Sequence, residues 1–124
     1  MFAPKAAPAL VAGDTIVIKP SEETPHNAVK FCELVAETDL PPGVLNVVHG
    51  RGASVGSALA RSPRIGMVSS TGSVETGSAL MAAADPNITK VNLELGGKAP
   101  ALVMADADID LAVQAVKNSG VLNI

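Results

Sequence analysis

The apolar positions of this chain change their spacing repeatedly, and these changes predict alternating strands and helices. Short β-branched runs bounded by Gly or Pro predict strands, whereas apolar positions recurring every three or four residues predict helices. The predicted strands cover 15–18, 44–48, 65–69, 88–95 and 101–104. The predicted helices cover 5–12, the residues after Thr24-Pro25, 53–60, 74–84 and a last segment capped by Asp106 or Asp108.

Several boundaries carry their own local signals. Gly13 follows the first helix, and Thr24-Pro25 predicts an N-cap followed by Pro at the first helical position. In the second helix one predicted apolar face holds Ala28, Phe31, Cys32 and Val35. The sequence shows no internal repeat and no linker.

Strands that alternate with helices through short connections favour parallel pairing and right-handed crossovers. We therefore expect residues 1–124 to form one α/β domain, a Rossmann-like doubly wound parallel sheet of about five strands with flanking helices. Ligands bind such sheets at the carboxyl ends of the strands. The polar and Gly-rich segments fall at these ends, in residues 19–22, 50–56, 69–77 and 94–97.

Composition narrows the function classes. Only 2 % of the residues are aromatic. The charged fraction is 17 %, which is below the usual level of about 25 %. This low charge fits either a surface that another part of a larger protein covers or simply an Ala-rich domain. A net charge of −3 without a basic cluster argues against nucleic acid, and no apolar run is long enough for a membrane span. One cysteine and no visible signal peptide predict a cytoplasmic protein. His26 and His49 lack partners at metal-ligand spacing, so no metal is expected.

The segment Val91 to Pro100 places a single carboxylate, Glu94, between two leucines at a strand end, followed by two glycines. Apolar neighbours disfavour the charged form of a carboxylate and make it a better proton acceptor near neutral pH. Glu94 is therefore a candidate general base. The alternative interpretation is a solvated carboxylate before a Gly turn.

Three loops are candidates for binding a dinucleotide. The loop from Gly50 to Gly56 has G-x-G-x-x-x-G spacing, and Ser70-Thr71-Gly72-Ser73 precedes a helix whose free N–H groups favour phosphate. Ordinary turn geometry and N-capping by Ser73 are the alternatives. Lys19 and Glu22 could bind the ribose hydroxyls, or could form only a surface ion pair. At an effective dielectric constant near 20, a 2′-phosphate about 4 Å from Glu22 would meet roughly 4 kcal/mol of repulsion per unit charge. Solvent and Lys19 would weaken this repulsion, so NAD is favoured over NADP but is not strictly imposed.

Taken in order, four segments resemble the NAD-dependent aldehyde dehydrogenases. They are Lys19-Pro20-Ser21-Glu22-Glu23-Thr24-Pro25, residues 40–48, Ser70-Thr71-Gly72-Ser73 and Leu93-Glu94-Leu95-Gly96-Gly97-Lys98-Ala99-Pro100. Residues 106–112 also resemble that family, and the sequence as a whole is most similar to its lactaldehyde and glycolaldehyde branch. The resemblance covers essentially the whole chain.

The resemblance implies a role for each matching residue. Glu94 would be the general base, and the cofactor-binding residues would be Lys19, Ser21 and Glu22 at the ribose, Gly52 and Gly56 at the adenine side, Thr71, Gly72 and Ser73 at the pyrophosphate, and Leu95 at the nicotinamide end. In this family a cysteine thiolate attacks the aldehyde, hydride passes to NAD, and water hydrolyses the thioester.

The chain also departs from the family pattern. Ser70 stands where the family usually has Phe, the family's catalytic cysteine is expected a few positions beyond Ile124, and its oxyanion-hole asparagine before Met1. Cys32, on an apolar helix face, is expected to be a structural thiol. By resemblance the full-length enzyme is a homo-oligomer acting on a small aldehyde. Two other hypotheses for the function of this chain stay open. It could be a non-catalytic nucleotide-binding module, or an interaction segment that folds against a partner.

Overall fold

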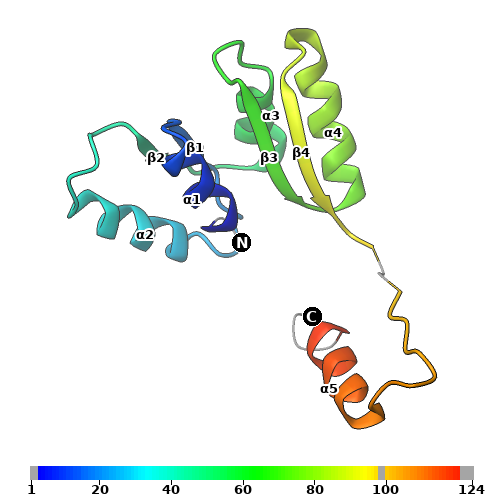
Figure 1. Cartoon of the computed structure of the whole chain (residues 1–124). Coiled ribbons are helices and arrows are strands. Elements are labelled where there is room, and N and C mark those ends of the chain that lie inside the picture. Colours follow the sequence, from blue (N-terminus) through cyan, green and yellow to red (C-terminus); the bar gives the residue numbers. More distant parts are fainter. Residues whose placement is uncertain (1–2, 98–99, 121–124) are drawn as a thin grey trace.

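The computed structural model describes residues 3–97 and 100–120 (Figure 1). Its helices are α1 (Ala3–Val11), α2 (His26–Ala36), α3 (Ser57–Ala60), α4 (Val74–Ala84) and α5 (Ile109–Gly120), with a π-helical turn η1 (Gly52–Gly56) and a 3₁₀ turn η2 (Asp85–Asn87). Its strands are β1 (Ile16–Ile18), β2 (Leu45–Val47), β3 (Met67–Gly72) and β4 (Lys90–Leu95).

The end of α1 confirms the predicted stop at Gly13. Gly13 adopts a φ of +87°, and its N–H donates to the carbonyl of Leu10 at 3.1 Å while the N–H of Asp14 donates to Ala9 at 3.0 Å. These two bonds form a Schellman motif, in which glycine takes the left-handed conformation after the last helical turn. The chain is thereby turned into β1.

The predicted apolar face of α2 is confirmed. Ala28 is buried, and the side chains of Phe31, Cys32 and Val35 are partly buried. The predicted cap is wrong: Pro25 itself stands at the N-cap position with helical backbone angles, and no side-chain hydrogen bond caps the helix. The Pro25 carbonyl accepts from the N–H groups of Ala28 at 3.1 Å and Val29 at 3.2 Å.

The strands pair in parallel, as expected for the α/β class, and form two pairs. β1 pairs with β2 in the register Ile16 to Leu45, and β3 pairs with β4 in the register Met67 to Lys90. The prediction of a fifth strand at 101–104 is wrong, because these residues have no regular structure. A strand needs a partner for its backbone groups, and Leu102, 87 % exposed, has no sheet edge beside it.

Another predicted element is divided. The single helix expected over 53–60 is a π-helical turn, η1, followed by the short helix α3. Gly52 and Gly56 bound the π-helical turn, and glycine lowers the preference for a regular α-helix. The irregular turn places both glycines beside the loop that follows β1.

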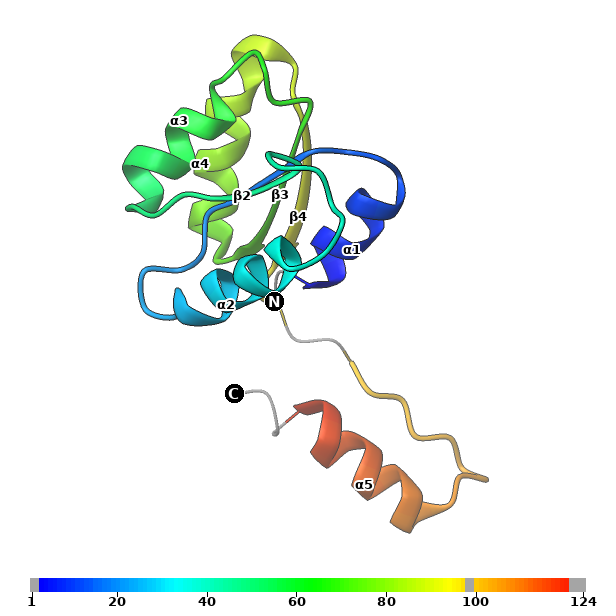
Figure 2. The ribbon, with the colours of Figure 1, turned by 90° about the vertical axis from the view of Figure 1, so that its left-hand side faces the viewer.

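The two faces of the β3–β4 pair differ in character. Figure 2 shows α3 and α4 on one side of these strands and α1 on the other. Val68, Val91 and Leu93 on the α4 side are partly buried. Ser69 on the α1 side accepts hydrogen bonds from Lys5 Nζ at 2.9 Å and from Asn92 Nδ2 at 3.4 Å. The sheet is therefore apolar beneath α4 and polar beneath α1.

The core within the described ranges consists of alanine side chains together with Ile18. Its buried apolar residues within the described ranges are Ala6, Ile18, Ala28, Ala60, Ala83 and Ala84. Methyl groups allow helices and strands to approach one another closely. No described helix is both long enough and apolar enough to cross a bilayer.

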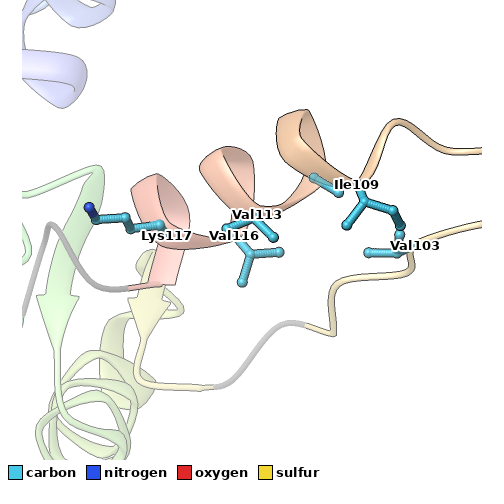
Figure 3. Close-up of a pocket in the computed structure, with 6 residues that line it drawn as sticks. Val103, Ile109, Val113, Val116 and Lys117 are labelled. Carbon is cyan, nitrogen blue, oxygen red and sulfur yellow. The ribbon is translucent and has the colours of Figure 1, made fainter.

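Helix α5 lies away from the two sheets, after an extended segment (Figure 1). The predicted cap is confirmed for Asp108, whose Oδ1 accepts from the N–H of Leu111 at 3.0 Å. An open apolar groove runs along the helix, lined by Val103, Ile109, Ala112, Val113, Val116 and Lys117 (Figure 3). It lies apart from every loop that the sequence nominates for cofactor binding.

Candidate functional site

The loops that follow β1 and β2 are joined by two side chains. Lys19 comes directly after β1, and its Nζ donates to the carbonyls of Pro20 at 2.7 Å and of Gly50 at 3.2 Å. The Oε1 atom of Glu22 accepts from the backbone N–H of Gly52 at 2.8 Å. Both cross-loop bonds join residues about thirty positions apart in sequence, because parallel pairing brings the strand ends to one edge. We call Lys19, Glu22, Gly50 and Gly52 the ribose cluster.

Two glycines shape the ribose cluster. Gly50 has a φ of +146°, and a Cβ at this position would collide with the side chain of Val55. At Gly56 a Cβ would stand 3.8 Å from Cδ of Lys19, so Gly56 packs beside the lysine stem. Gly52 and Gly56 therefore lie at the same edge as Lys19 and Glu22, as the sequence predicts. Gly50 belongs to the predicted loop from Gly50 to Gly56, but the sequence analysis assigns it no role of its own.

The structure disfavours the ion-pair interpretation of Lys19 and Glu22. Among residues 3–97 and 100–120, the one ion pair joins Lys30 to Glu33. Lys19 has two of its three N–H donors on carbonyls, and Glu22 uses one carboxylate oxygen. One donor and one acceptor oxygen are left over, which is what a ribose diol can pair with. Ser21 accepts from the N–H of Glu23 at 3.3 Å and so shapes the turn.

The carboxyl ends of β3 and β4 bring the second set of candidates together. β3 and β4 lie side by side (Figure 1), with Thr71 in register with Glu94 and Gly72 with Leu95. In a parallel pair, residues in register share a face, so Thr71 and Glu94 lie on the face opposite α4. We call Thr71, Gly72, Ser73, Glu94 and Leu95 the strand-end cluster.

Leu95 packs against α4 at a position where the helix has a glycine and therefore no side chain. Gly77 in α4 is buried, and a Cβ there would stand 2.8 Å from both Cδ atoms of Leu95. Only glycine lets the helix approach Leu95 this closely. The contact fixes the strand end next to Glu94.

Ser73 is the N-cap of α4. Its Oγ accepts from the N–H of Thr76 at 3.1 Å and lies 3.0 Å from Oγ1 of Thr76. The N-capping interpretation is therefore confirmed, and a phosphate would be bound by the remaining free N–H groups of this first turn together with the hydroxyl groups. Thr76, which the sequence analysis does not single out, is the residue whose backbone N–H Ser73 caps.

The side chain of Glu94 is exposed. The apolar surroundings expected from Leu93 and Leu95 are not formed, because alternate residues of a strand point to opposite faces and both leucines turn toward α4. The described residues therefore leave Glu94 accessible to water. Lys98 and Ala99, which continue the same motif, lie outside the described residues.

The remaining nucleophilic and metal-binding candidates lie elsewhere. Cys32 is partly buried in α2, and burial raises the pKa of its thiol, which opposes thiolate formation. His26 and His49 are exposed. No group of three or more His, Cys, Asp or Glu within residues 3–97 and 100–120 is placed to hold a metal ion.

Comparison with known proteins identifies the family of this chain. The sequence profile of the aldehyde dehydrogenase family matches residues 1–124. Lactaldehyde dehydrogenase of Escherichia coli K12 is 59 % identical over 123 residues, which is 99 % of this chain and 26 % of that protein. A solved structure of lactaldehyde dehydrogenase superposes with a TM-score of 0.90 at 60 % identity, covering 98 % of this chain and 26 % of that one.

Other solved structures of similar fold differ in cofactor. A Staphylococcus aureus betaine aldehyde dehydrogenase in complex with NAD⁺ is 42 % identical with a TM-score of 0.84, covering 94 % of this chain and 23 % of that one. An E. coli protein described as an NADP-dependent enzyme is 46 % identical with a TM-score of 0.86, covering 93 % of this chain and 24 % of that one. The chain thus spans about a quarter of the length of the relatives it matches. On these grounds it belongs to the NAD(P)-dependent aldehyde dehydrogenase family.

Proposed function

We propose that this chain supplies the cofactor-binding loops and the general base of an NAD-dependent aldehyde dehydrogenase that oxidises a small aldehyde to a carboxylic acid. The observation that carries the proposal is the ribose cluster, where Lys19 and Glu22 each bind the backbone of the opposite loop. A spare donor and a spare acceptor at one strand edge suit the two hydroxyls of a ribose.

The strand-end cluster supports the remaining assignments. The first turn of α4, capped by Ser73, offers backbone N–H groups to a pyrophosphate. Glu94 stands beside Thr71 at the same ends of the strands. When bound, NAD accepts the hydride from the substrate carbon.

Glu94 would act on the acyl intermediate. In the proposed reaction a cysteine thiolate adds to the aldehyde to give a thiohemiacetal, and loss of hydride leaves a thioester. An exposed carboxylate can take a proton from the attacking water, which releases the acid and the thiol. Cys32 is not the nucleophile, because burial raises the pKa of its thiol and it lies on a helix face.

The proposal is tested by titrating the chain with NAD and NADP in a calorimeter, with Glu22→Gln beside it. The glutamine keeps an oxygen for the Gly52 N–H but loses the charge. We expect NAD binding to weaken about tenfold, since a hydrogen bond to a charged group contributes about 1.5–3 kcal/mol. The preference for NAD over NADP should shrink as well.

The matched control is Glu37→Gln, which removes an exposed carboxylate at the C-cap of α2. It should leave the binding of both dinucleotides unchanged. If Glu22→Gln binds NAD as tightly as the unmodified chain, Glu22 has no role at the ribose and the proposal fails.

A further inference from the structure

Helix α5 carries an apolar stripe that the proposed function does not use. The stripe consists of Ile109, Ala112, Val113 and Val116, whose spacing of three and four residues places them on one face of the helix. We propose that this stripe is an interface with a second copy of the chain, in which the two α5 helices pack antiparallel about a two-fold axis. The proposal does not depend on the cofactor, because α5 lies away from the two sheets whose strand ends carry the cofactor loops (Figure 1).

The stripe on α5 is open to solvent. Ile109 is 63 % exposed, Val113 is 60 % exposed and Val116 is 44 % exposed, and all three line the groove of Figure 3. The helix has only 12 residues. Isolated helices shorter than about 12–15 residues are marginal in water, and most helices in proteins are stabilised by packing of their apolar face. A partner that covers the stripe would therefore stabilise α5 itself.

Two opposite charges lie along one side of the stripe, and they favour a second copy as the partner. Asp110 is in the first turn of α5 and Lys117 is in the last turn. They are seven residues apart, which is nearly two helical turns, so both lie on the same side of the helix. In an antiparallel pair the same side of each helix meets, so Asp110 faces the partner's Lys117, and the two-fold axis repeats this contact. A parallel pair would bring this side against Ala112 and Ser119, which carry no charge.

Both charges are available for this contact. Asp110 and Lys117 are exposed, and neither belongs to an ion pair within the part of the chain that the structure describes. The midpoint between them falls beside Val113, so the two-fold axis would pass near Val113 and bring Ile109 toward the partner's Val116. A two-fold interface uses the same patch on both subunits and must complement itself. The stripe meets this condition in its apolar residues and in its charges.

The oligomeric state of the whole chain tests the interface. Sedimentation equilibrium over a series of concentrations should show the mass rising from that of one chain toward that of two. Val113→Asp places a charge next to the two-fold axis and should weaken dimerisation more than about tenfold. The matched control is Leu111→Asp, which also replaces an exposed apolar residue of α5 but lies on the face opposite the stripe. It should leave the dimerisation constant within about twofold.

Two charge variants test the direction of packing and guard against misfolding. Asp110→Lys and Lys117→Asp each turn both attractive contacts of the dimer into repulsive ones, so each variant alone should dimerise about tenfold more weakly. In an equal mixture of the two variants, opposite charges face each other again at both contacts. The mixture should therefore form a heterodimer about as tightly as the unmodified chain dimerises, which a misfolded variant could not do.

The remaining outcomes contradict the proposal. A chain that stays monomeric at every concentration overturns it, and so does a Val113→Asp variant that dimerises as tightly as the unmodified chain. Charge variants that dimerise normally, or a mixture that does not recover, would exclude the antiparallel arrangement. None of these measurements involves NAD, so the result is independent of the function proposed above.

Discussion

The ribose cluster and the strand-end cluster sit at the same kind of place, the carboxyl ends of paired strands, yet they are held together differently. Lys19 and Glu22 cross between loops with their charged side chains. Thr71 and Glu94 are brought together by backbone register, and Leu95 by the absence of a side chain at Gly77. Charge substitutions should therefore disturb the first cluster, whereas backbone and capping substitutions should disturb the second.

Gly50 is an exception to this division between side-chain and backbone effects, and its substitution should have the largest effect. Although the ribose cluster is joined by side chains, Gly50→Ala forces a Cβ into Val55 at a φ that L-residues rarely adopt. We expect a loss of about 2 kcal/mol in unfolding free energy, measured by urea denaturation, because strained backbone of this kind costs about 1–3 kcal/mol. NAD binding should weaken more than tenfold.

The control for Gly50→Ala is Gly66→Ala. Gly66 has no positive φ, and a Cβ there would meet no atom within 4 Å. It should change neither stability nor binding. Equal behaviour of the two alanine variants would show that the turn at Gly50 is not strained.

Ser73→Ala tests the strand-end cluster. Losing the bond from Ser73 Oγ to the Thr76 N–H should lower the unfolding free energy by about 1 kcal/mol, the usual effect of removing an N-cap. Thermal and urea unfolding both report it. Ser78→Ala, on the exposed surface of α4, is the comparison and should be neutral or slightly stabilising. A neutral Ser73→Ala would mean that the cap contributes nothing.

An effect of similar size but opposite sign is expected at the turn before β4. Ile88 is 92 % exposed and has a φ of +54°, a conformation that a β-branched residue adopts at a cost of about 1–2 kcal/mol. Asparagine tolerates this region, so Ile88→Asn should raise the unfolding free energy by about 1 kcal/mol. Ile109→Asn, at another exposed isoleucine but within a helix, should give no gain. Loss of stability in Ile88→Asn would show that Ile88 makes contacts that outweigh the strain.

The sequence predicts best what is locally encoded. α4 begins and ends at the expected residues because Ser73 caps it and alanines follow. The strand predicted at 101–104 is wrong because pairing depends on a neighbour that local sequence does not specify.

The candidate sites divide in the same way. The meeting of the loops at Lys19 and Glu22 could be expected from parallel topology, but their partners, the Gly50 carbonyl and the Gly52 N–H, could not. The neighbours of Glu94 were misjudged because sequence adjacency to Leu93 and Leu95 does not mean a shared face in a strand.

The alanine core has a consequence for how this molecule tolerates change. At Ala60 and Ala84, 0 % and 1 % exposed, a methyl group already fills the available space. In a core with side chains of mixed sizes, a larger residue can be accommodated by substituting a smaller residue for its neighbour. An alanine neighbour cannot be made much smaller, because only glycine has a smaller side chain. Enlarging either position should therefore push α3 and α4 outward as rigid bodies, and the first turn of α4 would move with them.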